Sequence, residues 1–243
     1  MDCNLGPVAL LIDINQSRFA HWGNAMQVLV VASRKGGSGK TTLAGCLAVE
    51  AERAGSGPVA ILDADPMAGL GAWWHARQAA TPIMALVHDL DASLTTLRQQ
   101  GCALAIIDTA PSGNESVADA IAKADLVIIP VQPSPHDLRA VGATVEMAEA
   151  AEKKLCFILN RVKPRTRLAT QAILALSQHG PVSQILIHDR TDYAAAMTDG
   201  LTAPEIDPEG KAAGEIAGLW TYVSERLATT TTATPKAKKR AHA

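Results

Sequence analysis

Six short aliphatic runs recur along the chain and alternate with stretches whose apolar residues have helical spacing. The runs lie at 27–33, 58–65, 103–110, 125–132, 155–160 and 182–187, and PIMALV at 82–87 is predicted as a further strand. Nearly every residue in them is apolar, which is typical of parallel strands covered by helices on both faces. The pattern therefore predicts an α/β fold with a doubly wound, mostly parallel sheet that binds ligands at the carboxyl ends of its strands.

The intervening segments are predicted as helices, and the ends of the chain as appendages. The helices are predicted at 40–54, 67–80, 91–100, 113–123, 135–153, 165–179, 190–199 and 209–227. One domain is expected over residues 27–227, since an α/β unit of this length is commonly single. Residues 1–26 are an extension, an extra edge strand or the product of an early start codon. The polar stretch 228–243 is predicted to be a disordered basic tail.

Composition limits the classes of function. The net charge of −2 is not that of a polycation made for nucleic acid, although local basic patches can still bind DNA. No apolar run approaches the roughly 18 residues that span a bilayer, and PVALLIDI contains Asp13, so we expect a cytoplasmic protein. Four scattered cysteines form no C-x-x-C pair, which argues against disulfides and a metal cluster.

The segment RKGGSGKT, residues 34–41, follows the first strand and leads into a helix. Glycines let successive backbone N–H groups face phosphate oxygens, where the helix N-terminus adds its positive dipole end. Lys40 is expected to contact the β- and γ-phosphates of ATP, and Thr41 to contact the Mg²⁺ that bridges them. The predicted ATP-binding residues are Lys35, Gly36, Gly37, Ser38, Gly39, Lys40, Thr41 and Thr42.

This segment has a second lysine, Lys35, where the usual phosphate loop has none, and Arg34 replaces its first glycine. From the start of the loop, Lys35 is expected to project away from its own nucleotide. If two loops faced each other, it could neutralise phosphoryl charge in trans, as an arginine finger does. A surface lysine beside Arg34 is the alternative. With these residues the segment resembles the deviant Walker A motif of the ParA/MinD ATPases, whose signature lysine acts across an ATP-sandwich dimer.

Three further strand ends resemble elements of that family. ILDADP, 61–66, resembles its D-x-D-P element, which implies that Asp65 assists hydrolysis and that Asp63 belongs to the magnesium shell. AIIDTAPS, 105–112, resembles its Walker B strand, so Asp108 is expected to contact Mg²⁺. Asn160, the last residue of the predicted strand LCFILN, matches the asparagine that binds adenine, and 187–193 is expected to lie across the base. The predicted catalytic residues are Lys35, Lys40 and Asp65, and the metal set is Thr41, Asp63 and Asp108.

The resemblance covers residues 27–227 and is strongest to the short, ParF-like ParA proteins. It implies an ATPase that dimerises with ATP, binds DNA nonspecifically, associates with the nucleoid and positions a plasmid, chromosome or protein cargo. A ParB-like or cargo-adaptor partner would stimulate hydrolysis. The candidate DNA contacts are Arg161, Lys163, Arg165, Arg167 and Arg190, with Lys153 and Lys154 as further basic residues.

Two other functions remain at this point. A MinD-like membrane-associated ATPase would need a C-terminal amphipathic helix, for which AGLWTYVSERL, 217–227, is the candidate. An iron–sulfur protein that shares the loop would need cysteines that meet at a subunit interface.

Overall fold

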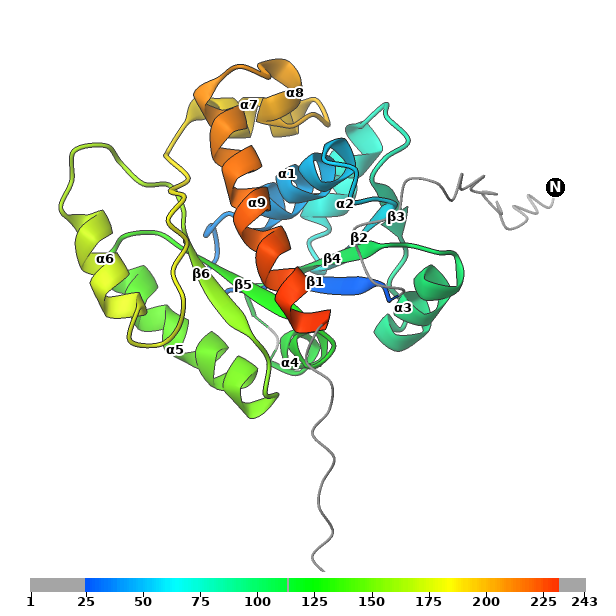
Figure 1. The fold of residues 1–243 in the computed structure, drawn as a ribbon, viewed down its shortest axis with the longest axis horizontal. Helices are drawn as coiled ribbons and strands as arrows, with labels where there is room; N and C mark the ends of the chain where they lie inside the picture. The colour runs from blue at the N-terminus through cyan, green and yellow to red at the C-terminus, as the bar shows by residue number, and fades with distance from the viewer. Residues whose placement is uncertain (1–24, 113, 232–243) are drawn as a thin grey trace, which may run out of the picture.

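A six-stranded, all-parallel sheet forms the centre of the computed structural model, which describes residues 25–112 and 114–231 (Figure 1). The strand order is β3-β2-β4-β1-β5-β6. The strands are β1 (Gln27–Val31), β2 (Val59–Ala64), β3 (Ile83–Ala85), β4 (Leu104–Thr109), β5 (Leu126–Val131) and β6 (Leu155–Leu159). Five of the six main aliphatic runs and the further strand at 82–87 are thus confirmed, and the fold is the doubly wound α/β class that the sequence predicts.

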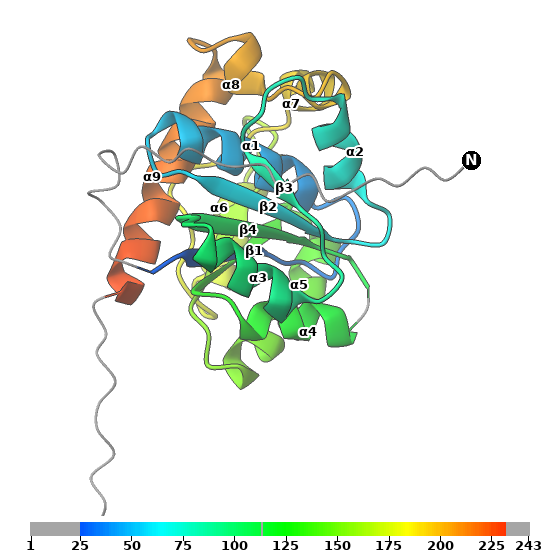
Figure 2. The ribbon, with the colours of Figure 1, turned by 90° about the vertical axis from the view of Figure 1, so that its right-hand side faces the viewer.

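Both faces of the sheet are buried, because alternate residues of each strand enter two separate cores. Leu29 and Val31 belong to one core, and Val28 and Val30 belong to the other. Figures 1 and 2 show α1, α2 and α7–α9 over the first face and α3–α6 over the second. Full burial of one such aliphatic side chain contributes about 1.5–3 kcal/mol, so the continuous apolar runs stabilise the sheet from both sides.

The helices follow the predicted segments closely. They are α1 (Lys40–Arg53), α2 (Gly69–Ala76), α3 (Leu90–Gln99), α4 (Asn114–Ala122), α5 (Pro135–Ala150), α6 (Leu168–Leu176), α7 (Thr191–Thr198), α8 (Ala203–Ile206) and α9 (Lys211–Thr231). The short α8 has no counterpart among the predictions. A capping box starts it: Thr202 and Glu205 satisfy each other's backbone N–H groups.

The strand predicted at 182–187 was wrong. An isolated bridge between Phe157 and Val182 joins this segment to β6, and a second bridge, between Val162 and His188, follows just beyond both. A few separate backbone hydrogen bonds, such as Ile187 N–H to the Leu159 carbonyl, complete the contact. The Ser183 side chain accepts the Ile185 N–H at 3.0 Å, and this local bond replaces a ladder bond in the middle of the segment. Residues 182–187 therefore run beside β6 without becoming a strand of the sheet.

The C-terminal helix is longer than predicted, since α9 continues to Thr231. The predicted tail from 228 therefore begins with helix, and the Lys154 ammonium donates to the Thr229 carbonyl at 3.3 Å. The rest of the tail, the predicted extension over 1–24 and the start of the helix predicted from 113 lie outside the described residues.

The strand order places a switch point at β1, which lies between β4 and β5. At such a point consecutive crossovers leave in opposite directions, and the carboxyl ends of the strands diverge into a crevice. Asp108 on β4 pairs in register with Val31 on β1 and with Asp63 on β2. The sheet thus brings the phosphate-loop candidate and the aspartates to one edge.

Candidate functional site

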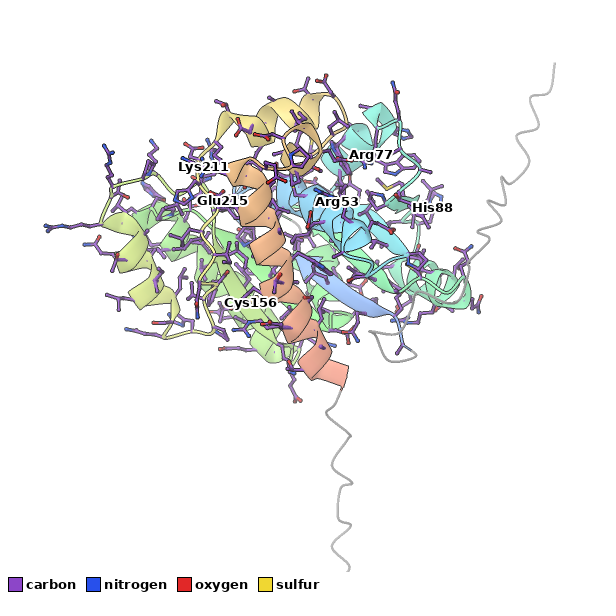
Figure 3. All side chains as sticks on the ribbon, turned by 45° about the horizontal axis from the view of Figure 1, so that its top comes forward. Arg53, Arg77, His88, Cys156, Lys211 and Glu215 are labelled. Atoms are coloured by element: carbon purple, nitrogen blue, oxygen red, sulfur yellow. The ribbon has the colours of Figure 1, made fainter. Side chains whose placement is uncertain are left out.

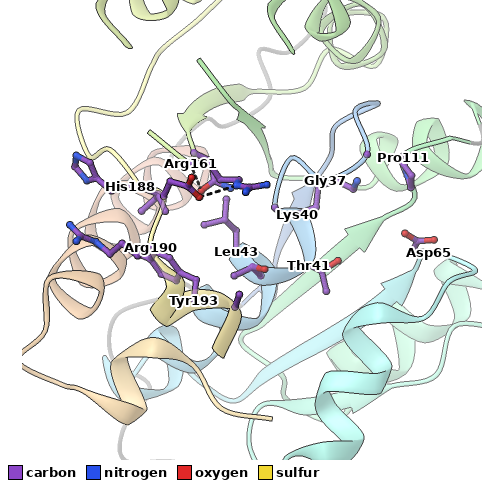
Figure 4. Close-up of a pocket in the computed structure, with 17 residues that line it drawn as sticks. Gly37, Lys40, Thr41, Leu43, Asp65, Pro111, Arg161, His188, Arg190 and Tyr193 are labelled. Carbon is purple, nitrogen blue, oxygen red and sulfur yellow. Dashed lines mark hydrogen bonds and ion pairs between the residues drawn. The ribbon is translucent and has the colours of Figure 1, made fainter. Parts of the chain in front are cut away.

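A cavity of about 450 Å³ lies at this edge of the sheet (Figure 4). Its two ends differ in chemistry. Figure 4 shows Gly37 and Lys40 at one end, near Asp65 and Pro111, and His188 and Arg190 at the other. The first end is lined by Gly36, Gly37, Gly39, Lys40, Thr41 and Thr42, and the second by Asn160, Arg161, His188, Asp189, Arg190 and Tyr193.

The loop between β1 and α1 has the backbone shape that its glycines permit. Gly37 has φ +74° and Gly39 has φ +94°, a left-handed region that other residues adopt at a cost. Gly39 caps α1, and Lys40 is the first residue of that helix. Backbone N–H groups at the start of α1 have no helical acceptor, so this end of the cavity favours an anion.

Two amide side chains from neighbouring strands hold the loop. Asn160, after β6, donates its Nδ2 to the Ser38 carbonyl at 2.7 Å. Gln132, after β5, donates its Nε2 to the Gly37 carbonyl at 2.7 Å. The role of Gln132 was not predicted, although its position directly after an aliphatic strand is a usable signal.

Asp108 lies beneath the start of α1, in contact with Thr41, and does not itself line the cavity. Thr41 Oγ1 donates to Asp108 Oδ2 at 2.6 Å, and the Asp108 side chain is fully buried. Burial raises the pKa of Asp108 to about 7, against the hydrogen bond from Thr41. Burial likewise lowers the pKa of Lys40, while the charges of Asp108 and Asp65 oppose that shift.

The residues at this position fit a magnesium ion. Asp108 Oδ1 is buried and has no hydrogen-bond partner in the part of the chain that the structure describes. A buried carboxylate oxygen without a donor is costly unless a cation or a cation-bound water meets it. With the Thr41 hydroxyl beside it, Asp108 supplies the hard oxygen ligands that Mg²⁺ prefers.

The two aspartates of the β2–α2 turn have different environments. Asp63 accepts the Asp65 N–H at 3.1 Å and the Gly71 N–H at 2.8 Å, so each of its carboxylate oxygens is hydrogen-bonded to a backbone N–H group. Asp63 lies near Asp108 but does not line the cavity. Asp65 lines the cavity, and within the described part of the chain only one of its oxygens is engaged, by the Met67 N–H at 3.0 Å.

The far end of the cavity is made by the segment after β6 and by the segment before α7. Asn160 Oδ1 accepts the Arg161 N–H at 2.9 Å, which leaves one amide N–H and one lone pair of Asn160 for a ligand. Arg161, with φ +53°, pairs with Asp189 at 3.2 Å, the dashed contact in Figure 4. Segment 187–193 runs beside Asn160, since the Ile187 N–H donates to the Leu159 carbonyl at 3.0 Å, and both line the cavity. Its position across a bound base stays a prediction.

The five candidate DNA contacts divide into two groups. Arg161 and Arg190 line the cavity and form ion pairs with Asp189 and Glu215. Lys163, Arg165 and Arg167 are exposed in the loop between β6 and α6. Lys153 and Lys154 precede β6 and therefore lie at the opposite edge of the sheet.

Lys35 is half-buried at the start of the loop, beside the exposed Arg34. Its backbone N–H donates to Ser33 Oγ at 3.3 Å. The Lys35 side chain does not line the cavity, and its ammonium has no hydrogen bond or ion pair within residues 25–112 and 114–231. Within a single chain, the second lysine of the loop is therefore available for another partner.

A membrane-associated ATPase would need an exposed apolar face on its C-terminal helix, and an iron–sulfur protein would need cysteines at a subunit interface. The apolar face of α9 packs into the core through Ile216, Leu219, Trp220 and Val223, so it is not free to enter a membrane surface. No helix in the described ranges combines the length and apolar character needed to cross a bilayer. Cys46, Cys102 and Cys156 are buried inside the fold, where burial raises the pKa of each thiol, to about 12 for Cys46.

Comparison with known proteins identifies a nucleotide-binding family. The model of the CobQ/CobB/MinD/ParA nucleotide binding domain matches residues 29–203. Maintenance of carboxysome distribution protein A from Halothiobacillus neapolitanus is 29% identical over 203 residues, covering 79% of this chain and 93% of that protein. Protein ParA from Rhizobium radiobacter is 33% identical over 188 residues, covering 72% of this chain and 84% of that protein.

Solved structures show the same fold. The ATP complex of a McdA variant from Cyanothece aligns with a TM-score of 0.68 and 21% identity, over 84% of this chain and 97% of that one. MinD in the MinC:MinD complex of Aquifex aeolicus aligns with a TM-score of 0.67 and 17% identity, over 87% and 99%. The family model, the relatives and the phosphate loop agree: the chain belongs to the ParA/MinD family of nucleotide-binding proteins.

Proposed function

We propose that this protein is an ATP-hydrolysing switch that dimerises when it binds Mg-ATP, binds DNA nonspecifically as a dimer, and positions a cargo. Family membership and the cavity geometry support ATP as the ligand. The Lys35 ammonium, which has no partner among the described residues, carries the proposal, because a free cation beside a phosphate site can bond to phosphate oxygens held by a second chain.

ATP binding follows from the two ends of the cavity. The loop N–H groups and Lys40 hold the phosphates, and Asn160 with segment 187–193 holds the base. Thr41 and Asp108 would hold Mg²⁺, which supplies positive charge to the β- and γ-phosphates. Asp63 fixes the turn that carries Asp65, since it accepts the Asp65 N–H. It lies next to Asp108 in the sheet and would belong to the outer shell of the magnesium site.

Hydrolysis requires a water molecule aligned with the γ-phosphate. Asp65 is the carboxylate at the phosphate end with an oxygen left to orient that water and accept its proton. The water oxygen then bonds to the γ-phosphorus as the bond to the β–γ bridging oxygen breaks, giving ADP and phosphate. Lys40 of the same chain and Lys35 of the partner subunit neutralise the charge that develops on the transferred group.

The Lys35 assignment is tested with Lys35→Ala. We expect the variant to bind ATP within a few-fold of wild type, to stay monomeric with a non-hydrolysable analogue, and to lose about 10³-fold or more in turnover, as for an arginine finger. Arg34→Ala, the exposed neighbour, is the matched control and should dimerise and hydrolyse normally. Normal dimers and turnover in Lys35→Ala would refute the trans assignment.

DNA binding is proposed for the loop that carries Lys163, Arg165 and Arg167. The chain has no Asp or Glu from Lys153 to His188, so no acidic residue within that stretch offsets the charge of this loop. The loop follows the carboxyl end of β6, the same edge as the nucleotide cavity. Exposed Arg and Lys side chains without pairing contact phosphates without sequence preference.

Nucleotide dependence of DNA binding is tested by a gel shift on random-sequence duplex with ATP, ADP and no nucleotide. We expect retardation with ATP alone, because only the dimer presents two basic loops at once. Equal binding in all three conditions would contradict a switch and would leave a nucleotide-binding protein with a constitutive DNA surface.

The proposed cargo role rests on the relatives, whose names refer to carboxysome distribution and to partitioning. We propose that the protein acts in the cytoplasm, binds the nucleoid with ATP, and meets a ParB-like or cargo-adaptor partner that stimulates hydrolysis. A plasmid, a chromosome or a protein assembly would be moved as the dimer forms and dissociates.

A further inference from the structure

One carboxylate on α9 contacts five polar groups of the segment that forms the far end of the cavity. Glu215 Oε1 accepts from Arg190 Nη2 at 2.6 Å and Nε at 3.0 Å, and it contacts His188 Nδ1 at 2.7 Å. Glu215 Oε2 accepts the His188 N–H at 3.1 Å and the Tyr193 hydroxyl at 2.9 Å. Figure 3 shows Glu215 on α9, above Cys156.

The three partner residues all line the cavity, whereas Glu215 does not. The Glu215 side chain is only 12% exposed, so its charge is screened little by solvent. Burial raises its pKa, but the bonds from Arg190, His188 and Tyr193 outweigh that effect and hold the pKa below its usual range. Glu215 is therefore an anion whose charge is balanced by the groups that face the ligand.

The geometry of Arg190 limits what this contact can do. Its Nε and Nη2 are committed to Glu215, which fixes the plane of the guanidinium and leaves Nη1 and one Nη2 hydrogen for the cavity. His188 is oriented through both its ring and its backbone. Segment 187–193 is attached to the β6 side through Val162, whose backbone pairs with Ile187 and Asp189. Glu215 is its attachment to α9.

We propose that Glu215 is a positioning residue for the base and ribose of the bound nucleotide, acting from α9 through His188, Arg190 and Tyr193. This inference rests on the proposed occupation of the cavity by ATP. The phosphate loop is held by different bonds, which the Asn160 and Gln132 side chains donate to its Ser38 and Gly37 carbonyls. Glu215 therefore affects the nucleoside part of the ligand and leaves the triphosphate contacts unchanged.

The test compares three ligands on Glu215→Gln by titration calorimetry with Mg²⁺: ATP, ADP and inorganic tripolyphosphate. The amide keeps the shape of the side chain but removes the charge that fixes Arg190. We expect ATP and ADP to bind about tenfold more weakly, a change of about 1.4 kcal/mol, and tripolyphosphate to bind within twofold of wild type. Glu225→Gln, an exposed glutamate on the same helix, should change none of the three affinities.

A second variant covers the case in which Glu215→Gln does not fold. Tyr193→Phe removes one hydroxyl and keeps the buried ring, so about a threefold loss for ATP and ADP alone is expected. Unchanged ATP affinity, or an equal loss for all three ligands, would overturn the positioning role. Wild-type protein that fails to bind ATP would overturn the proposed function, and this inference with it.

Discussion

Gly39 is the residue at which backbone conformation and packing most narrowly limit the phosphate loop. Its φ is +94°, and a Cβ at this position would collide with Asn160 Nδ2, the atom that holds the Ser38 carbonyl. Gly36, in the same loop, has an ordinary φ, and a Cβ there meets nothing within 4 Å. The two glycines therefore differ in what they contribute to the nucleotide-free protein.

We predict that Gly39→Ala lowers the free energy of unfolding by about 1–3 kcal/mol, the cost of a strained left-handed residue plus the displaced amide. Gly36→Ala should stay within about 0.5 kcal/mol of wild type. Urea unfolding of the nucleotide-free proteins measures both values. Equal stability of the two variants would mean that Asn160 does not brace the loop.

Asp108 should make the stability of the folded protein depend on pH, and bound Mg²⁺ should remove that dependence. Its folded pKa is about 7, above the ordinary 3.8, because the carboxyl is buried. Between these values the folded state keeps a proton that the unfolded state has released. The contribution of Asp108 to stability is therefore fully present below about pH 4 and is lost as the pH rises toward 7.

We predict that the melting temperature of the Mg²⁺-free protein falls more steeply from pH 5 to pH 7 than that of Asp108→Asn. A single proton contributes at most about 1.4 kcal/mol per pH unit to this slope. Asp199→Asn, an exposed carboxylate, should leave the slope unchanged. Thermal melts at several pH values, with EDTA and with Mg²⁺, measure the difference, and identical slopes would contradict the buried, unpartnered carboxyl.

At the scale of elements, Arg77 joins the end of α2 to α8. Its side chain is 3% exposed and pairs with both oxygens of Glu205, at 2.6 Å and 2.9 Å. It also donates to the Thr81 and Gly200 carbonyls and lies 5.4 Å from the Trp73 ring centre. Arg53, by contrast, is 44% exposed and meets Glu50 at 3.5 Å.

Removing the Arg77 charge leaves Glu205 unpaired in a half-buried site. We predict that Arg77→Met costs about 3–5 kcal/mol of stability and that Arg77→Met with Glu205→Gln costs much less than the sum of the single changes. Arg53→Met should cost less than about 1 kcal/mol. Chemical denaturation of the four variants gives the coupling energy, and additive costs would show that the pair does not join the elements.

The sequence predicted the elements well where one residue pattern decides the structure, as in the aliphatic runs of β1 and β4. It failed where a single side chain redirects the backbone. Ser183 replaces a ladder bond at 182–187, and Thr202 with Glu205 starts a helix too short to have a periodicity.

The candidate site was predictable on the phosphate side, because loop, Thr41 and Asp108 follow from motif spacing and strand ends. The base side was less so. Arg161 and Arg190 carry the charge expected of DNA contacts, yet each lines the cavity and is paired with an acidic residue that sequence spacing does not reveal. Glu215 lies on a helix far along the chain from its partners and belongs to no motif, so no signal in a single sequence marks it.

At the scale of the whole molecule, the charge distribution leads to a prediction about salt. Each phosphate contact that is lost lowers the slope of log K against log salt by about 0.9. We predict that Lys163→Ala, Arg165→Ala and Arg167→Ala together make this slope shallower by up to about 2.7 for each basic loop, and so by up to about 5 for the ATP-bound dimer with its two loops. Lys153→Ala, at the opposite edge of the sheet, should leave it unchanged. Filter binding at several salt concentrations decides between them.

The position of β1 in the sheet also bears on synthesis at the ribosome. The first strand of the fold pairs with β4 and β5, through contacts such as Gln27 with Leu104 and Leu29 with Leu126, and never with the strand that follows it. These contacts span most of the first half of the chain, and such long closures fold slowly. A nascent chain therefore exposes its phosphate loop long before it can bind a nucleotide. Bound nucleotide can stabilise the loop only after β5 has emerged from the ribosome.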